Sequence, residues 1–149
     1  MPKITHVAAI DVLNNPPPEN IVVISIRDPG TRFASLYDEI DRKLVNHTVI
    51  PIYAFDLIDE VHGCLTEDDA AKIAKVLIEQ SELGNDVVVH CTAGICRSGA
   101  VAEAGMMLGL FEKQRSNRQP NILFKRKIVV EVLHLKPEQA EIAINRRGI

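Results

Sequence analysis

The sequence contains no tryptophan, only three cysteines, and no apolar run of the roughly 20 residues that a membrane-spanning helix needs. Its first 20 residues also lack the apolar stretch and the small-residue cleavage site of a secretory signal. We therefore expect a cytoplasmic protein without a membrane partner. The cysteines, Cys64, Cys91 and Cys96, are an odd set without framework spacing, which argues against a disulfide-stapled domain and leaves thiols available for chemistry.

An excess of positive charge is missing too. The chain has 17 Lys and Arg residues against 20 Asp and Glu residues, a formal net charge of -3. Nonspecific nucleic-acid binding depends on a strongly cationic surface, so we expect no nucleic-acid partner. A chain of 149 residues with 46% hydrophobic residues is long enough to bury one core, and we expect a single domain over residues 1–149.

Three apolar, β-branched runs are present, and helical patterns separate them. The runs cover residues 21–26, 47–55 and 86–90, and each predicts a buried strand. Strands that alternate with helices predict an α/β fold with a central, mostly parallel sheet flanked by helices.

The best marked helix begins after Thr66, a good N-cap residue with Asp69 three positions later, and stops at Gly84. In the segment after Pro120, strand propensity competes with helical spacing, and we favour a helix. Helical patterns also cover residues 33–44, 98–111 and 137–148.

The stretch HCTAGICRSG, residues 90–99, connects the third predicted strand to the next helix. A helix N-terminus presents unpaired N–H groups and the positive end of the helix dipole, so anions bind there. Gly94 lets the backbone approach a phosphate closely, and the guanidinium of Arg97 matches two phosphate oxygens. The same positive field favours the thiolate form of Cys91. These residues predict a sulfur nucleophile aimed at a bound phosphate.

Four residues of this stretch match the H-C-x5-R-[ST] signature of the protein tyrosine phosphatase superfamily: His90, Cys91, Arg97 and Ser98. In its small size and in the late position of the motif, the chain resembles the dual-specificity branch. RQPN, residues 118–121, is similar to the R-x-x-P-N segment that follows the loop helix in that branch. ISIRDPG, residues 24–30, is similar to a segment of small bacterial and viral phosphatases. The resemblance implies a dual-specificity-phosphatase-like fold.

The resemblance also implies a role for each signature residue. Cys91 would form a cysteinyl-phosphate, Arg97 would clamp the phosphate, and Ser98 would hydrogen-bond the thiolate as it leaves. His90 would orient the cysteine through backbone contacts. The other loop residues would surround the phosphate: Thr92, Ala93, Gly94, Ile95 and Cys96. Such chemistry needs no cofactor, and the scattered His62, Cys64 and His90 do not have the paired spacing of a zinc site.

A phosphatase of this family also needs an acid to protonate the leaving oxygen, normally an aspartate a few tens of residues upstream. Asp56 and Asp59 lie 35 and 32 residues before Cys91. We favour Asp56 because it directly follows the second predicted strand, with Asp59 as the alternative. The Trp-Pro pair that precedes the acid in larger tyrosine-specific enzymes is absent, which supports the dual-specificity assignment.

The second cysteine of the loop has two interpretations. The pattern C-x4-C-R-S resembles the loop of low-molecular-weight tyrosine phosphatases, whose extra cysteine can form a disulfide with the nucleophile. Cys96 would then protect an oxidised Cys91 from irreversible damage, with Cys64 as a competing partner. Alternatively, Cys96 is a small side chain that fills the loop.

We interpret the chain as a phosphomonoester hydrolase that removes phosphate from phosphotyrosine in proteins, and from phosphoserine or phosphothreonine as well. Its partner would be a phosphorylated protein. An RNA 5′-phosphatase is an alternative that the net charge of -3 disfavours. A noncatalytic phosphate-binding module is the second alternative, disfavoured because nucleophile, clamp and acid are all present. Lipid-phosphate relatives commonly carry lysines inside the loop, and this loop has none.

Overall fold

The computed structural model describes residues 2–112 and 118–138. Its centre is a five-stranded sheet with the order β3-β2-β4-β1-β5, and every pair of neighbouring strands is parallel. The strands are β1 (Lys3–Ala8), β2 (Val22–Arg27), β3 (Val49–Tyr53), β4 (Val87–Cys91) and β5 (Phe111–Glu112). The predicted α/β fold with a mostly parallel sheet is confirmed, and the described sheet is parallel throughout.

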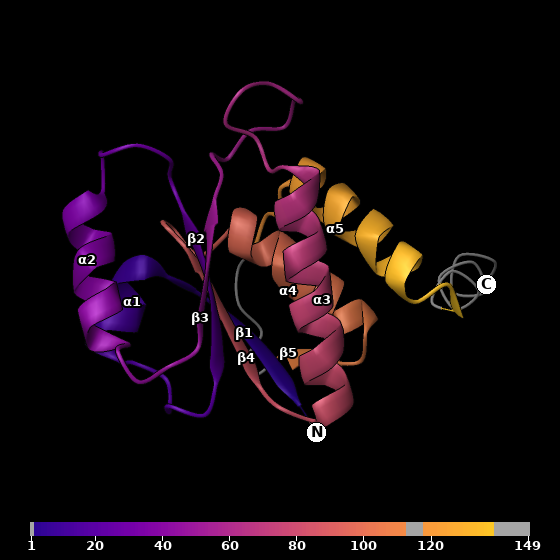
Figure 1. Cartoon of the computed structure of the whole chain (residues 1–149), viewed down its shortest axis with the longest axis horizontal. Coiled ribbons are helices and arrows are strands. Elements are labelled where there is room, and N and C mark those ends of the chain that lie inside the picture. Colours follow the sequence, from indigo (N-terminus) through magenta and orange to yellow (C-terminus); the bar gives the residue numbers. More distant parts are fainter. Residues whose placement is uncertain (1, 113–117, 139–149) are drawn as a thin grey trace.

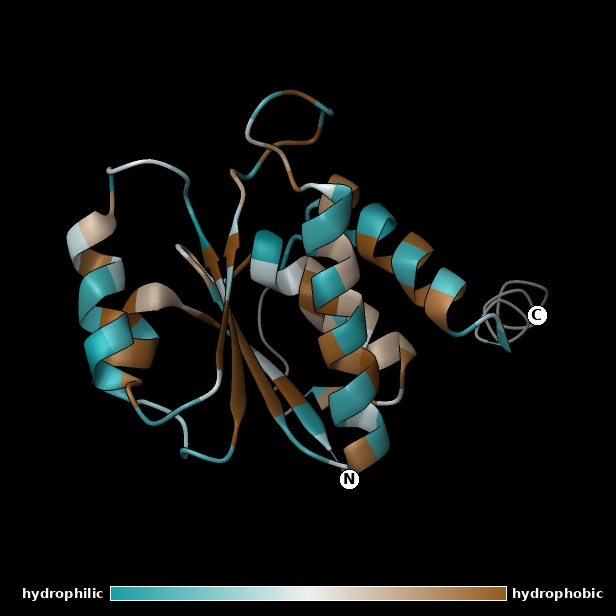
Figure 2. Cartoon of the chain, in the orientation of Figure 1, coloured by the Kyte–Doolittle hydropathy of each residue, from teal (hydrophilic) through white to brown (hydrophobic). Residues whose placement is uncertain are grey.

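Helices cover both faces of the sheet, as Figure 1 shows. They are α1 (Ala9–Asn14), α2 (Ala34–Lys43), α3 (Glu67–Leu83), α4 (Arg97–Met107) and α5 (Ile122–Leu135). The first two lie on one face, and the other three lie on the opposite face. The strands between the two layers are largely apolar, and polar residues gather on the outer helix surfaces (Figure 2). No helix among the described residues combines the length and the apolar character needed to cross a membrane.

Each face of the sheet has its own hydrophobic cluster. The larger one joins strand residues such as Ile24 and Val89 to α3, α4 and α5, with Phe124 fully buried among them. The smaller one packs α1 and α2 on the other face, around Tyr37 and Ile40. Apolar burial on both faces explains why the strands are continuous apolar runs in the sequence.

The helix caps agree with the sequence in α3. The Thr66 side chain accepts a hydrogen bond of 3.1 Å from the backbone N–H of Asp69. Gly84 ends the helix with φ of 73°, a left-handed conformation that glycine adopts without strain. The helix predicted after Pro120 is α5, which begins after Asn121.

Two parts of the chain depart from the sequence-based prediction. The periodicity gave no element before residue 21, yet β1 lies inside the sheet between β4 and β5, followed directly by α1. Phe111 was expected on a helical face but belongs to β5, because α4 ends at Met107 and Gly109 turns the chain at φ of 95°. The helix predicted for residues 137–148 lies almost wholly outside the described residues.

Candidate active site

The predicted phosphate loop connects β4 to α4 at the carboxyl ends of the parallel strands. In sheets of this kind, ligands bind at that edge, where loops and helix N-termini converge. The strand order puts β4 between β2 and β1, so the loop is flanked by the ends of both neighbours. The motif therefore occupies the centre of the functional edge.

Cys91 is the last residue of β4 and is 2% exposed. Its sulfur accepts a hydrogen bond of 3.2 Å from the backbone N–H of Gly94, and it lies 3.2 Å from the hydroxyl oxygen of Ser98. Both groups can donate to a thiolate, which has no hydrogen of its own. The loop thus places two hydrogen-bond donors around the sulfur and holds it in one position.

Gly94 is required by the path of the loop. Its φ is 75°, and a Cβ atom there would come within 2.4 Å of the backbone of Val7 and Ala8 at the end of β1. The Gly94 carbonyl also accepts a hydrogen bond of 2.7 Å from Nδ1 of the buried His6. The end of β1 therefore supports the loop from behind. His6 is a residue of the candidate site that the sequence did not predict.

Arg97 is buried at the start of α4, and three groups fix its guanidinium. Nη1 donates to the carboxylate of Asp28 at 2.5 Å and to the carbonyl of Ala54 at 2.8 Å. Nη2 donates to the hydroxyl of Thr92 at 3.0 Å. Nε has no hydrogen-bond partner among the described residues, and it shares one edge of the planar group with Nη2. That edge has the fork geometry that binds two phosphate oxygens.

Asp28 is the second residue that sequence reasoning missed. It follows β2 directly, 69 positions before the arginine that it contacts, and it is 9% exposed. Its backbone N–H donates to the hydroxyl of Tyr37 at 2.8 Å, which fixes the turn. The signal in the sequence was an aspartate at the carboxyl end of a buried strand, the place where functional side chains gather in parallel sheets.

The two candidate acids differ in their contacts. Asp56 accepts a hydrogen bond of 2.6 Å from the side-chain amide of Asn121, which also donates to the carbonyl of Leu57 at 3.1 Å. The backbone N–H of Asn121 donates to the carbonyl of Cys96, so this residue joins the acid loop to the phosphate loop. The side chain of Asp59 is exposed and forms no hydrogen bond or ion pair with another described residue. Of the two, Asp56 is the one held at the loop.

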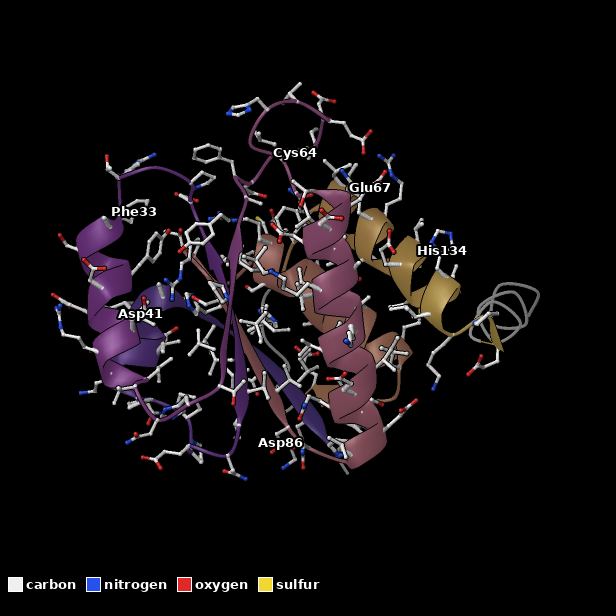
Figure 3. The ribbon with its side chains drawn as sticks, in the orientation of Figure 1. Phe33, Asp41, Cys64, Glu67, Asp86 and His134 are labelled. Atoms are coloured by element: carbon white, nitrogen blue, oxygen red, sulfur yellow. The ribbon has the colours of Figure 1, made fainter. Side chains whose placement is uncertain are left out.

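The other loop residues of the prediction lie between Cys91 and α4. Cys96 is partly exposed. The pKa of its thiol is raised, mainly by partial burial and secondly by the negative charge of the Asp56 carboxylate. Cys64 lies in the loop before α3 (Figure 3), where it contacts the carbonyl of Leu65. All three cysteines are free thiols. Thr92 binds Arg97, while Ala93 and Ile95 complete the turn.

His90 is fully buried beside the nucleophile. Burial lowers the pKa of His90 to about 4, and the nearby positive charges of Arg27 and Arg97 act in the same direction. The imidazole is therefore neutral at neutral pH. Its Nε2 atom lies 2.6 Å from the hydroxyl oxygen of Ser25 on β2.

A metal centre is not among the features of the described residues. Within residues 2–112 and 118–138, no three histidine, cysteine, aspartate or glutamate side chains gather as metal ligands would.

No family model matches the sequence, and no curated protein matches it. Among solved structures, the chain is similar to the crystal structure of PTPMT1, with a TM-score of 0.55 and 14% identity over 93% of this chain and 95% of that one. It is also similar to the crystal structure of Tk-PTP in the active form, with a TM-score of 0.45 and 20% identity over 97% of this chain and 91% of that one. The likeness to PTPMT1 concerns the course of the backbone. The chain thus shares its α/β fold with that solved structure, and this fold agrees with the dual-specificity-phosphatase-like fold that the loop motif predicts.

Proposed function

We propose that the protein is a cysteine-dependent phosphomonoester phosphatase that acts on phosphotyrosine in proteins, and on phosphoserine or phosphothreonine as well. The observation that carries the proposal is the pairing of two features in one loop. The sulfur of Cys91 faces the N–H of Gly94 and the hydroxyl of Ser98. Three groups anchor the guanidinium of Arg97, and its Nε has no hydrogen-bond partner among the described residues.

In the first chemical step, the Cys91 thiolate attacks phosphorus, the S–P bond forms and the bond from phosphorus to the leaving oxygen breaks. Asp56 gives its proton to that oxygen. Arg97 and the loop N–H groups stabilise the charge on the three remaining phosphate oxygens. The products are the dephosphorylated hydroxyl group and a cysteinyl-phosphate.

In the second step, water attacks the cysteinyl-phosphate and the S–P bond breaks. The Asp56 carboxylate takes a proton from this water, which restores the acid for the next cycle. Ser98 donates its hydroxyl hydrogen to the departing sulfur, 3.2 Å away, and so stabilises the thiolate that is released. Inorganic phosphate then leaves.

The experiment is hydrolysis of p-nitrophenyl phosphate by the purified protein in the presence of a chelator. We expect turnover in wild type, none in Cys91→Ser, and wild-type turnover in Cys64→Ser, whose thiol lies outside the phosphate loop. A wild-type protein that binds tungstate without turnover would be a phosphate-binding module. Full activity in Cys91→Ser would rule out the proposed mechanism.

The substrate class needs its own comparison. Phosphotyrosine, phosphoserine and phosphothreonine peptides should be hydrolysed, with phosphotyrosine fastest, and an RNA carrying a 5′-triphosphate should not. The net charge of -3 supports this preference, because it offers little attraction to a polyanion. The proposed compartment is the cytoplasm, where a reducing environment keeps the nucleophile as a thiol. Faster turnover of the RNA than of every peptide would reverse the assignment.

A further inference from the structure

A polar chain that the proposed mechanism does not use crosses the sheet behind the nucleophile. Ser25 on β2 and His90 on β4 are partners in the strand register, so their side chains lie on the same face. Arg27 lies two residues beyond Ser25 and shares this face. Asp41 approaches from α2, the helix that covers the face (Figure 3).

Hydrogen bonds connect these four residues in a row. The guanidinium of Arg27 binds both carboxylate oxygens of Asp41, at 3.0 and 2.5 Å. Nε of Arg27 donates to the hydroxyl oxygen of Ser25 at 2.9 Å, and that oxygen lies 2.6 Å from Nε2 of His90. Ser25 and His90 are fully buried and Arg27 is 4% exposed, so water does not compete for most of the chain.

The positions of the hydrogens follow from this arrangement. Arginine always donates, so the Ser25 oxygen accepts from Arg27. Among the described residues, Nε2 of His90 is the only acceptor of the Ser25 hydroxyl hydrogen. If Nε2 carried a hydrogen instead, the Ser25 hydrogen would be buried without a recorded acceptor, at a cost of about 1–3 kcal/mol. Nε2 is therefore unprotonated, and a neutral His90 carries its hydrogen on Nδ1.

Nδ1 of His90 is buried and has no hydrogen-bond partner of normal geometry among the described residues. An interaction with the backbone of the next residue, Cys91, acts to raise the pKa of His90, against the larger effect of burial. We propose that the chain Asp41–Arg27–Ser25 holds His90 as the neutral Nδ1–H tautomer and so fixes the orientation of the ring beside the nucleophile. Ser25 and Arg27 are positioning residues, since they act on Cys91 through His90.

The charges around His90 keep this state over a wide pH range. Burial is the largest influence on its pKa, which is about 4. Arg27 on β2 and Arg97 on α4 oppose a second proton, while Asp41 on α2 favours it. On the remaining side, its register partner on β1 is Val7, which has no charge. The tautomer should therefore persist from pH 8 down to about 5.

The first test is a long-range ¹H–¹⁵N correlation spectrum of the imidazole groups, with His90 assigned from its loss in His90→Asn. The expected pattern is that of the Nδ1–H tautomer, unchanged between pH 5 and 8. An Nε2–H pattern, or titration of His90 near its ordinary value of 6.5, would overturn the proposal. This measurement uses the wild-type protein, so it does not depend on any variant folding.

The second test uses variants of the chain. Ser25→Ala should convert His90 to a mixture of tautomers and lower kcat/KM by about 3- to 10-fold, the equivalent of one hydrogen bond. Ser25→Thr, which keeps the hydroxyl, should restore the Nδ1–H pattern. Asp41→Asn should shift the tautomers in the same direction as Ser25→Ala. Asp38→Asn, an exposed position on the same helix, should leave the spectrum unchanged. A Ser25→Ala protein that keeps the pure Nδ1–H pattern would contradict the proposal.

The inference rests on the proposed function only in naming Cys91 as the nucleophile, and the two can fail separately. An Nδ1–H tautomer in a protein without phosphatase activity would support the hydrogen-bonded chain and contradict the proposed function. An active phosphatase with an Nε2–H tautomer would support the proposed function and contradict the role of the hydrogen-bonded chain.

Discussion

Asn121 donates a hydrogen bond of 2.6 Å from its side-chain amide to the Oδ1 atom of Asp56. Because Oδ1 accepts this bond, the proton that Asp56 would give to a leaving group resides on its other oxygen. Asn121 also caps α5, by accepting from the N–H of Phe124 at 3.0 Å. Asn121 thus fixes both the start of α5 and the orientation of the proposed acid.

Replacement of the acid should have an effect that depends on the leaving group. Asp56→Asn should lower kcat by about 10²–10⁴-fold for an alkyl phosphate, whose leaving oxygen needs a proton. For p-nitrophenyl phosphate the loss should be much smaller, because nitrophenolate is a stable anion. Steady-state kinetics with both substrates measure the difference. Asp59→Asn is the matched control, and the same leaving-group dependence in that variant alone would transfer the role to Asp59.

Asn121 should act through Asp56. In Asn121→Ser the hydroxyl can still cap α5, so the fold should remain stable, but it cannot bind Asp56 and Leu57 as the amide does. We expect kcat to fall by roughly 10-fold for an alkyl phosphate, the equivalent of one hydrogen bond, and little for an aryl phosphate. Asn85→Ala, which removes an exposed side-chain contact with Gln80, is the control. An equal loss with both substrates would indicate a general structural effect instead.

Asp28 should determine how well Arg97 binds phosphate. Asp28→Ala removes the carboxylate that fixes Nη1, so the fork can turn away from the substrate. A hydrogen bond between charged groups corresponds to about 10- to 100-fold in kcat/KM, and Asp28→Asn, which keeps an oxygen, should lose less. Kinetics and tungstate binding measure the effect. Tighter tungstate binding in both variants would mean that Asp28 competes with phosphate for Arg97.

Burial of neutral His90 should make the fold less stable in mild acid. Its pKa is about 4 in the folded protein and 6.5 in an unfolded chain, so the unfolded state binds the proton more readily as pH falls. Because of this difference, the free energy of unfolding should fall by about 3 kcal/mol as the pH drops from 6.5 to 4. Above pH 7, His90 should cause no change in the free energy of unfolding. Urea unfolding of wild type and His90→Gln at several pH values isolates the effect. A parallel pH dependence in both proteins would contradict it.

The two cysteines of the loop should form a disulfide after mild oxidation. Cys91 would react first with peroxide to give a sulfenic acid, and Cys96 would then displace water to form the S–S bond. The raised pKa of Cys96 keeps it protonated, so this second step should become faster as pH rises. Peptide mapping identifies the bond. Dithiothreitol should restore phosphatase activity in the oxidised wild type but not in Cys96→Ser, when each activity is expressed relative to that of the same protein before oxidation. A link between Cys91 and Cys64, or normal recovery in Cys96→Ser, would leave Cys96 as loop packing.

The local part of the site could be predicted from the sequence. The sulfur, the clamp and Ser98 lie within eight consecutive residues, and one strand-to-helix turn brings them together. Asp28 and His6 could not be found this way, since they reach the loop from the ends of β2 and β1, across 69 and 88 residues of sequence. Their partners depend on the strand order, which no local pattern reveals.

The first strand was missed for a related reason. Its six residues include lysine, threonine and histidine, and a helix follows without a turn, so the apolar signal is short. Its place between β4 and β5 comes from long-range pairing of Ile4 with Val87. The contact that distinguishes Asp56 from Asp59 likewise involves Asn121, 65 residues away in the sequence.

Because Gly94 packs closely against the end of β1, the shape of the phosphate loop depends on when β1 joins the sheet. β1 is synthesised before its partner β4, which lies more than eighty residues later, so their pairing has a high cost in loop-closure entropy. Until that pairing forms, the loop lacks the wall that shapes its anion cradle. A chain in which β1 and β4 have not yet paired would carry the Cys91 thiol in a loop that is not shaped to hold a phosphate, so the proposed activity would require this pairing.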